Sequence, residues 1–135
     1  MDSRCYLERH RTNRLKIENK RIQIASRKGS ADGLGNVSDG ERVQSSGNKQ
    51  RMATAVVSYV DLEREVEVLE AENKAIERNI EMLSGNQYDV IYKHYVLDMS
   101  MKQITLLKGK SPSWARTIHT RALESLQEIL DAQGI

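Results

Sequence analysis

The sequence has one cysteine, one proline and no phenylalanine, and aromatic residues make up only 4% of its 135 residues. Because the single cysteine, Cys5, has no partner within the chain, a disulfide-stabilised scaffold is excluded. Few aromatic residues and 30% charged residues suit helices with narrow apolar seams better than a thick core packed on a sheet. We therefore expect an all-α protein.

Long hydrophobic runs are also missing, and no apolar stretch approaches the length of a membrane span. The first residues carry too many charges for a secretory signal peptide. These absences predict a cytoplasmic protein with no membrane partner. A chain of this length has room for one domain, or for a small domain and an extended element.

The net charge of +2 hides an uneven distribution along the chain. Residues 1–28 contain nine Lys or Arg against three Asp or Glu, whereas residues 51–83 contain four against eight. Residues 93–121 contain six basic residues against Asp98 alone. Two basic segments therefore flank an acidic one.

The first basic segment, residues 1–28, is predicted to be helical because it has no Gly or Pro and is rich in Arg, Lys, Glu, Leu and Ile. Its apolar side chains form a broad stripe on two neighbouring seven-residue registers, one with Leu7, Ile17 and Ile24 and the other with Leu15 and Ile22. Residues 29–50 are rich in Gly, Ser, Asp and Asn instead. This composition predicts a flexible connector.

Residues 51–83 have the clearest periodicity and are predicted to form one long acidic helix with a coiled-coil seam. Its seam residues recur at steps of three and four: Met52, Ala55, Tyr59, Leu62, Val66, Leu69, Asn73, Ile76, Ile80 and Leu83. The flanking positions carry five glutamates: Glu63, Glu65, Glu70, Glu72 and Glu77.

The seam and its flanks indicate what kind of helix packs there. Asn73 at a seam position costs stability but fixes the register of the pair. In a parallel homodimer Glu65 would face Glu70, so like charges disfavour that pairing. The basic helix of residues 1–28 is the expected partner, folded back antiparallel. Self-association through the coiled coil is the alternative.

A new unit, residues 84–135, is predicted to follow the long helix. Ser84, Gly85 and Asn86 end that helix, and a short apolar helix follows. A second helix opens at Ser100, carries Met101, Ile104 and Leu107 at helical spacing, and is closed by Gly109. Ser111 as N-cap and Pro112 at the first position begin a third helix, residues 112–130. This order of elements is that of a helix-turn-helix, in which the last helix enters the major groove.

The stretch "MLSGNQYDVIYKHYVLDMSMKQITLLKGKSPSWARTIHTRALESLQEIL" resembles the DNA-binding fourth region of sigma factors, in the form found in small phage and prophage regulators of the RinA-like and ArpU-like kind. The likeness lies in the paired tyrosines, "Ser-x-x-x-Ile", the Gly at the turn, the Ser cap and "Ile-His-x-Arg-Ala-Leu". The upstream "VSDGERVQSSGNKQRM" and "SYVDLEREVE" resemble a phage family of unknown function that joins a helical hairpin to this module.

The resemblance implies a sequence-specific transcriptional regulator of phage or prophage genes that binds double-stranded DNA, with RNA polymerase as a second partner. It implies no enzymatic activity. The helix-turn-helix geometry predicts these DNA-binding residues: Lys102, Gln103, Lys110, Ser111, Ser113, Arg116, Thr117, Thr120 and Arg121.

Among these residues, Arg116 is expected to reach a base edge and Lys102 a phosphate. Trp114 is expected to pack under the turn, and His119 to lie on the surface or against the DNA backbone.

Other functional classes find less support in the sequence. His10, His94 and His119 lack metal-ligand spacing with one another and with Cys5, so no metal site is expected. We expect neither a cofactor nor a small-molecule substrate. Two alternatives to a regulator remain: a small terminase subunit that marks viral DNA for packaging, and an adaptor that uses the helix-turn-helix to bind protein without DNA.

Overall fold

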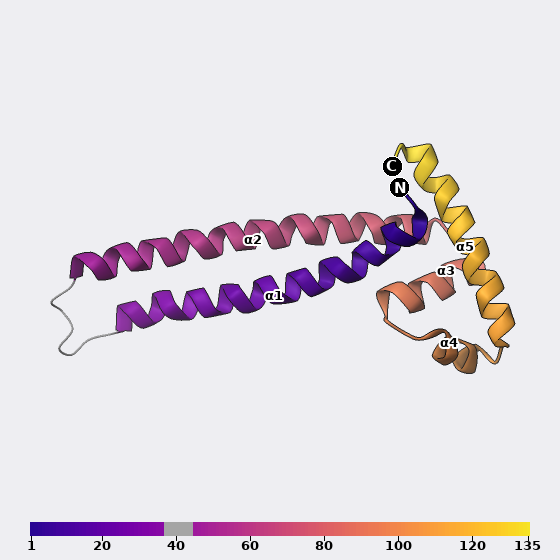
Figure 1. Cartoon of the computed structure of the whole chain (residues 1–135), viewed down its shortest axis with the longest axis horizontal. Coiled ribbons are helices and arrows are strands. Elements are labelled where there is room, and N and C mark those ends of the chain that lie inside the picture. The colour runs from indigo at the N-terminus through magenta and orange to yellow at the C-terminus, as the bar shows by residue number, and fades with distance from the viewer. Residues whose placement is uncertain (37–44) are drawn as a thin grey trace. The chain divides into compact units, whose positions relative to one another are not determined.

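The computed structural model describes the backbone of residues 1–36 and 45–135 and the side chains of residues 1–29 and 59–135. Its described part is all-α and contains no strand. The elements in chain order are α1 (Ser3–Asn36), α2 (Ser45–Glu81), α3 (Gly85–Ile91), the π-helical segment η2 (Tyr92–Val96), α4 (Met101–Lys108) and α5 (Pro112–Gln133) (Figure 1).

The helices extend further into the predicted connector than the sequence indicated. Residues 29–36 continue α1 and residues 45–50 begin α2, so the predicted coil over 29–50 was too long, and only 37–44 lie outside the described residues. Propagating an existing helix costs little once its first turn has formed, so isolated Gly and Ser residues do not stop it at once.

The described chain divides into two compact units, one of residues 14–70 and one of residues 1–13 and 71–135. These boundaries differ from the predicted segments, because the first turns of the basic helix belong to the same unit as the C-terminal helices.

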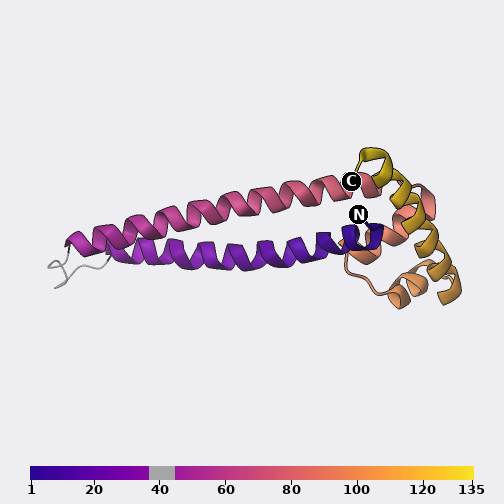
Figure 2. The ribbon, with the colours of Figure 1, turned by 45° about the horizontal axis from the view of Figure 1, so that its top comes forward.

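In the unit of residues 14–70, α1 and α2 run antiparallel side by side (Figures 1 and 2). Their core contains Ile17 and Ile24 from α1 with Leu62 and Val66 from α2, and Tyr59 and Leu69 pack against it half-buried. The second predicted register of α1 is not part of this core, since Leu15 and Ile22 are 57% and 61% exposed. The side chains of Met52 and Ala55 lie outside the described residues.

Ion pairs join the basic and acidic helices in this unit. Lys20 Nζ lies 2.8 Å from Glu65 Oε2, Arg21 Nη2 lies 2.6 Å from Glu70 Oε1, and Lys28 Nζ lies 3.3 Å from Glu63 Oε1. Exposed pairs of this kind contribute roughly 0.2 to 1 kcal/mol each, so the apolar seam supplies most of the stability. The main effect of the charges is on specificity, because they favour the basic helix α1 over a second acidic helix as the partner of α2.

The other unit buries the remaining seam residues of α2 against the first turns of α1, α3, η2 and α5. Its core includes Leu7, Ile76, Ile80, Ile91 and Leu126, all at most 1% exposed. Ser3 Oγ donates to the carbonyl oxygen of Leu123 at 2.9 Å, which fixes the start of α1 on α5. The two termini also lie close together (Figure 1), with Met1 N 3.3 Å from the carbonyl oxygen of Ile135.

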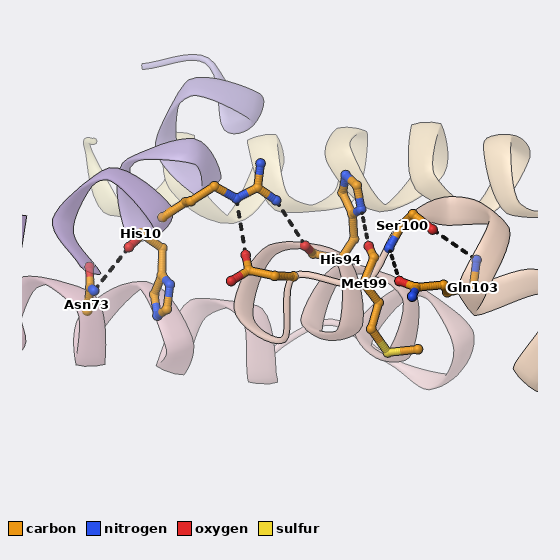
Figure 3. A network of polar contacts seen from close by, with 8 residues as sticks. His10, Asn73, His94, Met99, Ser100 and Gln103 are labelled. Atoms are coloured by element: carbon orange, nitrogen blue, oxygen red, sulfur yellow. Dashed lines mark hydrogen bonds and ion pairs between the residues drawn. The ribbon is translucent and has the colours of Figure 1, made fainter. Parts of the chain in front are cut away.

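Asn73 is buried where the sequence predicted a register-fixing amide. Its Nδ2 donates to the carbonyl oxygen of His10 at 3.2 Å, as Figure 3 shows, and its Oδ1 accepts from Asn13 Nδ2 at 2.9 Å. A shifted register would leave these buried amides without partners, at a cost of roughly 1 to 3 kcal/mol each. At this position the seam of α2 therefore packs against α1.

Candidate nucleic-acid interface

The helix α4 begins and ends where local chemistry requires it. Ser100 Oγ accepts from the backbone N–H of Gln103 at 3.1 Å, and the Gln103 side chain accepts from Ser100 N at 2.9 Å (Figure 3). This reciprocal capping box satisfies two backbone donors at the helix start. At the other end Gly109 adopts φ of 66°, a left-handed conformation that glycine reaches without strain.

After a turn of three residues, 109–111, α5 begins at the predicted position. Ser111 has extended backbone angles and its Oγ accepts from Trp114 N at 3.1 Å, while Pro112 occupies the first helical position. Lys110 Nζ lies 5.7 Å from the centroid of the Trp114 ring, close enough for a cation–π contact. Trp114 is half-buried, and it supports the cationic side chain that precedes the helix.

The long helix α5 has a buried side and an exposed polar side. Ala115, Ala122, Leu126 and Leu130 are fully buried. The polar side, which we call the outer face, consists of five exposed residues: Ser113, Arg116, Thr117, Thr120 and Arg121. The other four predicted DNA-binding residues, Lys102, Gln103, Lys110 and Ser111, are exposed as well.

His119 is not on the outer face, so the prediction of a surface histidine was wrong. Its side chain is 9% exposed and its Nε2 lies 2.8 Å from the Tyr95 hydroxyl. Burial, followed by repulsion from His94 and Arg4, lowers the pKa of His119 to about 4, so the ring is neutral at pH 7. The position was readable from the sequence, because residue 119 follows Ala115 by four and precedes Ala122 by three.

The α4 helix departs from its predicted pattern in a similar way. Leu107 is 64% exposed, while Thr105, which we did not assign to the core, is 5% exposed. The Thr105 hydroxyl donates to the carbonyl oxygen of Lys102 at 2.8 Å, so this buried polar group is satisfied within its own helix.

Two of the six basic residues in 93–121 are neutralised inside the unit. Lys93 and Lys108 both donate to the carboxylate of Asp89 on α3. Partial burial acts to raise the pKa of Asp89, but the hydrogen bonds from Lys108 and Lys93 outweigh it and hold this pKa below its ordinary value. The exposed positive charge of the segment therefore comes from four side chains: Lys102, Lys110, Arg116 and Arg121.

A cavity of about 440 Å³ lies beside the outer face of α5, and sequence reasoning missed it. The first turns of α1 supply Arg4, Glu8 and Arg11 to its lining, and α5 supplies Arg116 and Thr120. From the sequence, pairing with the acidic helix is the favoured explanation of the basic charge of residues 1–28, and direct DNA binding by this helix is the alternative. No local signal brings Arg4 next to Arg116, because more than a hundred positions separate them in the chain.

The π-helical segment η2 forms another wall of this cavity with His94 and Tyr95. Short π-helical segments often occur at functional sites. The segment is held at its end by His94 Nδ1, 2.8 Å from the carbonyl oxygen of Met99 (Figure 3). Arg11 also donates to the carbonyl oxygen of His94 at 3.1 Å and to Asp98 Oδ1 at 3.2 Å.

The described residues offer neither a metal cluster nor a membrane span. Residues 1–29 and 59–135 contain no group of three or more His, Cys, Asp or Glu side chains able to hold a metal ion. None of the described helices is both long and apolar enough to cross a membrane. In comparisons with known proteins, no protein-family model, curated protein or solved structure matches this chain.

Proposed function

We propose that the chain is a sequence-specific DNA-binding regulator of transcription that places α5 in the major groove. The observation that carries this proposal is the outer face of α5, whose five exposed polar residues follow a well-defined helix start. A helix with this composition matches the donors and acceptors of base edges and phosphates. The preceding helix α4 and the glycine turn have the order of elements expected of a helix-turn-helix.

Charge supports the same proposal. Lys102, Lys110, Arg116 and Arg121 leave an exposed positive segment after Asp89 has neutralised its two lysines. If all four cations neutralised phosphates, log K for duplex DNA would fall with log salt with a slope of about −3.6, and each one that reads a base edge instead makes the slope shallower by about 0.9. Using all six basic residues of 93–121 would predict a steeper slope, so the measured slope also tests the role of Asp89.

The experiment is a titration of the full chain with labelled duplexes at several salt concentrations, using a site selected from random DNA and an unrelated duplex. We expect Arg121→Gln to weaken duplex binding, whereas Arg64→Gln, which removes the same charge from an exposed position on α2, leaves it nearly unchanged. Undetectable binding at low salt would reject DNA as the partner.

A second candidate function, protein binding by an adaptor, is favoured by exposed leucines on and near α4. Leu97, Leu106 and Leu107 are 54%, 74% and 64% exposed. Leu106 and Leu107 are neighbours in α4, and adjoining apolar side chains on a surface often mark protein contacts. In this alternative RNA polymerase is the partner and no DNA is bound, so Leu106→Asp would weaken polymerase binding in a chain that shows no duplex binding.

A further inference from the structure

The cavity beside α5 collects more positive charge than its walls neutralise. Arg4, Arg11 and Arg116 line it together with one carboxylate, Glu8. Guanidinium groups present fixed, planar donors that match phosphate oxygens, and Thr120 adds a hydroxyl donor to the same wall. The two histidines of the lining do not repel an anion, since a histidine side chain is either neutral or positively charged.

The three arginines have different tasks within the protein. Arg11 is committed to η2, because it donates to Asp98 and to the backbone of His94. Arg4 and Arg116 are both exposed, and Arg4 also forms a side-chain hydrogen bond with Tyr95. A guanidinium group has five N–H donors, so these two exposed side chains, from helices at opposite ends of the sequence, still have donors for a ligand.

The floor of the cavity connects these helices through buried polar groups. Arg4 forms a side-chain hydrogen bond with Tyr95, and the Tyr95 hydroxyl lies 2.8 Å from His119 Nε2 on α5. Two hydrogen bonds also hold Ser3 against α5. Its N–H donates to Gln127 Oε1 at 2.8 Å, and its hydroxyl donates to the carbonyl oxygen of Leu123. Arg4, one residue further along α1, is thus held at a fixed place beside α5.

We propose that this cavity binds a phosphate group between Arg4 of α1 and Arg116 of α5. The cavity volume of about 440 Å³ falls within the range of roughly 300 to 1,000 Å³ typical of ligand sites, which leaves room for the sugar that carries the phosphate. The phosphate comes either from the backbone of bound DNA or from a free phosphorylated molecule. Only the first source rests on the DNA-binding function proposed above.

The DNA source changes the role expected for Arg116. Its position along the helix alone predicted a contact with a base edge. Its place in the cavity with Arg4 instead favours a phosphate contact, which carries no sequence information. Ser113, Thr117 and Arg121 are outside the cavity lining and remain the base-reading candidates.

The test begins with inorganic phosphate, titrated into the full chain at low ionic strength and followed by calorimetry and by NMR of the His119 ring. Bound phosphate stabilises the charged imidazolium, so the pKa of His119 should rise. Arg4→Gln should weaken phosphate binding by about tenfold or more, the value of a lost charge-assisted hydrogen bond. Arg27→Gln removes the same charge from an exposed site on α1 outside the cavity and should have no effect.

A second arm uses duplex DNA with the same variants and with Arg116→Gln, and thermal melts establish that each variant is folded. Equal loss of selected and random duplexes in Arg4→Gln and Arg116→Gln identifies the DNA backbone as the source. Loss of phosphate binding with duplex binding intact identifies a free phosphorylated molecule. Phosphate binding without any duplex binding keeps the cavity proposal and rejects the DNA-binding function. No phosphate binding, or equal binding in Arg4→Gln and Arg27→Gln, overturns the cavity proposal.

Discussion

Leu7 and Leu15 carry the same side chain on the same helix, yet only Leu7 is fully buried, while Leu15 is 57% exposed. Leu7→Ala removes contacts in the core with Ile80 and Leu126 and leaves a void, so we expect it to lower the free energy of unfolding by roughly 2 to 5 kcal/mol. Leu15→Ala should change it by less than about 0.5 kcal/mol. Chemical denaturation of both variants measures the difference, and equal effects would contradict the burial of α1.

His119 makes stability depend on pH in a defined direction. Its pKa in the folded protein is about 4, below the ordinary value of 6.5, so the unfolded chain binds the proton first as the pH falls. The contribution of this group to the free energy of unfolding is therefore lost from about pH 6.5 down to about pH 4, by no more than about 1.4 kcal/mol per pH unit. Burial of the neutral ring is the cause.

The measurement compares wild type with His119→Gln, which keeps a hydrogen-bonding group near Tyr95 but cannot titrate. Denaturation curves between pH 4.5 and 7 should show a shallower loss of stability in the variant. Because His10, His94 and the carboxylates are common to both proteins, the difference between the two curves belongs to residue 119. Parallel curves would mean that this histidine does not contribute.

At the level of single helices, capping chemistry separates two serines at N-cap positions. The Ser100 side chain accepts a hydrogen bond in a capping box, whereas Ser84, before α3, makes no side-chain cap bond. We expect Ser100→Ala to cost about 0.5 to 2 kcal/mol and Ser84→Ala a smaller amount. Thermal melts of the two variants decide this, and a Ser84→Ala variant at least as unstable as Ser100→Ala would contradict it.

Both ends of α4 and the start of α5 were predictable from sequence because caps depend on a few adjacent residues, whereas α5 continues to Gln133, beyond the predicted end at residue 130. Each cap depends only on the backbone of its own helix end and needs no tertiary contact. The residues are Ser100, Gly109, Ser111 and Pro112. The π-helical segment η2 was not predictable. No residue type marks the wider turn, and one of the side chains that bonds to it, Arg11, comes from a distant helix.

The seam of α2 was predictable because it, too, is a local pattern. Apolar residues that recur at steps of three and four indicate which face of a helix is buried. The charge of its flanks further indicated a basic partner, and the ion pairs of Lys20 and Arg21 agree with that expectation. Periodicity does not identify which partner covers each turn. It therefore gave no sign that α1 changes partner along its length, packing Ile17 in one unit and Leu7 in the other.

At the level of the whole molecule, the first thirteen residues matter most, because they complete the unit that contains α4 and α5. Tyr6 and Leu7 belong to the same core as Leu126 and Leu130, although more than a hundred positions separate them. A contact over that distance leaves no pattern in a single sequence. The same contacts bring Arg4 to the cavity. The sequence did not predict that the start of α1 packs on α5, and for that reason it did not predict Arg4 as a site residue.

Deleting residues 1–28 tests this organisation as a whole. The deletion removes the side chains that cover Leu62 in one unit and Ile76 and Ile80 in the other, and exposed apolar seams associate. We expect the shortened chain to form oligomers or aggregates in light scattering at concentrations where the full chain does not. A synthetic peptide of residues 1–28, added in trans, should reverse the effect because it restores the seam and the ion pairs. A shortened chain with the same scattering as the full chain would mean that α1 is not needed to cover α2, and phosphate binding by that chain would independently exclude Arg4 as a ligand.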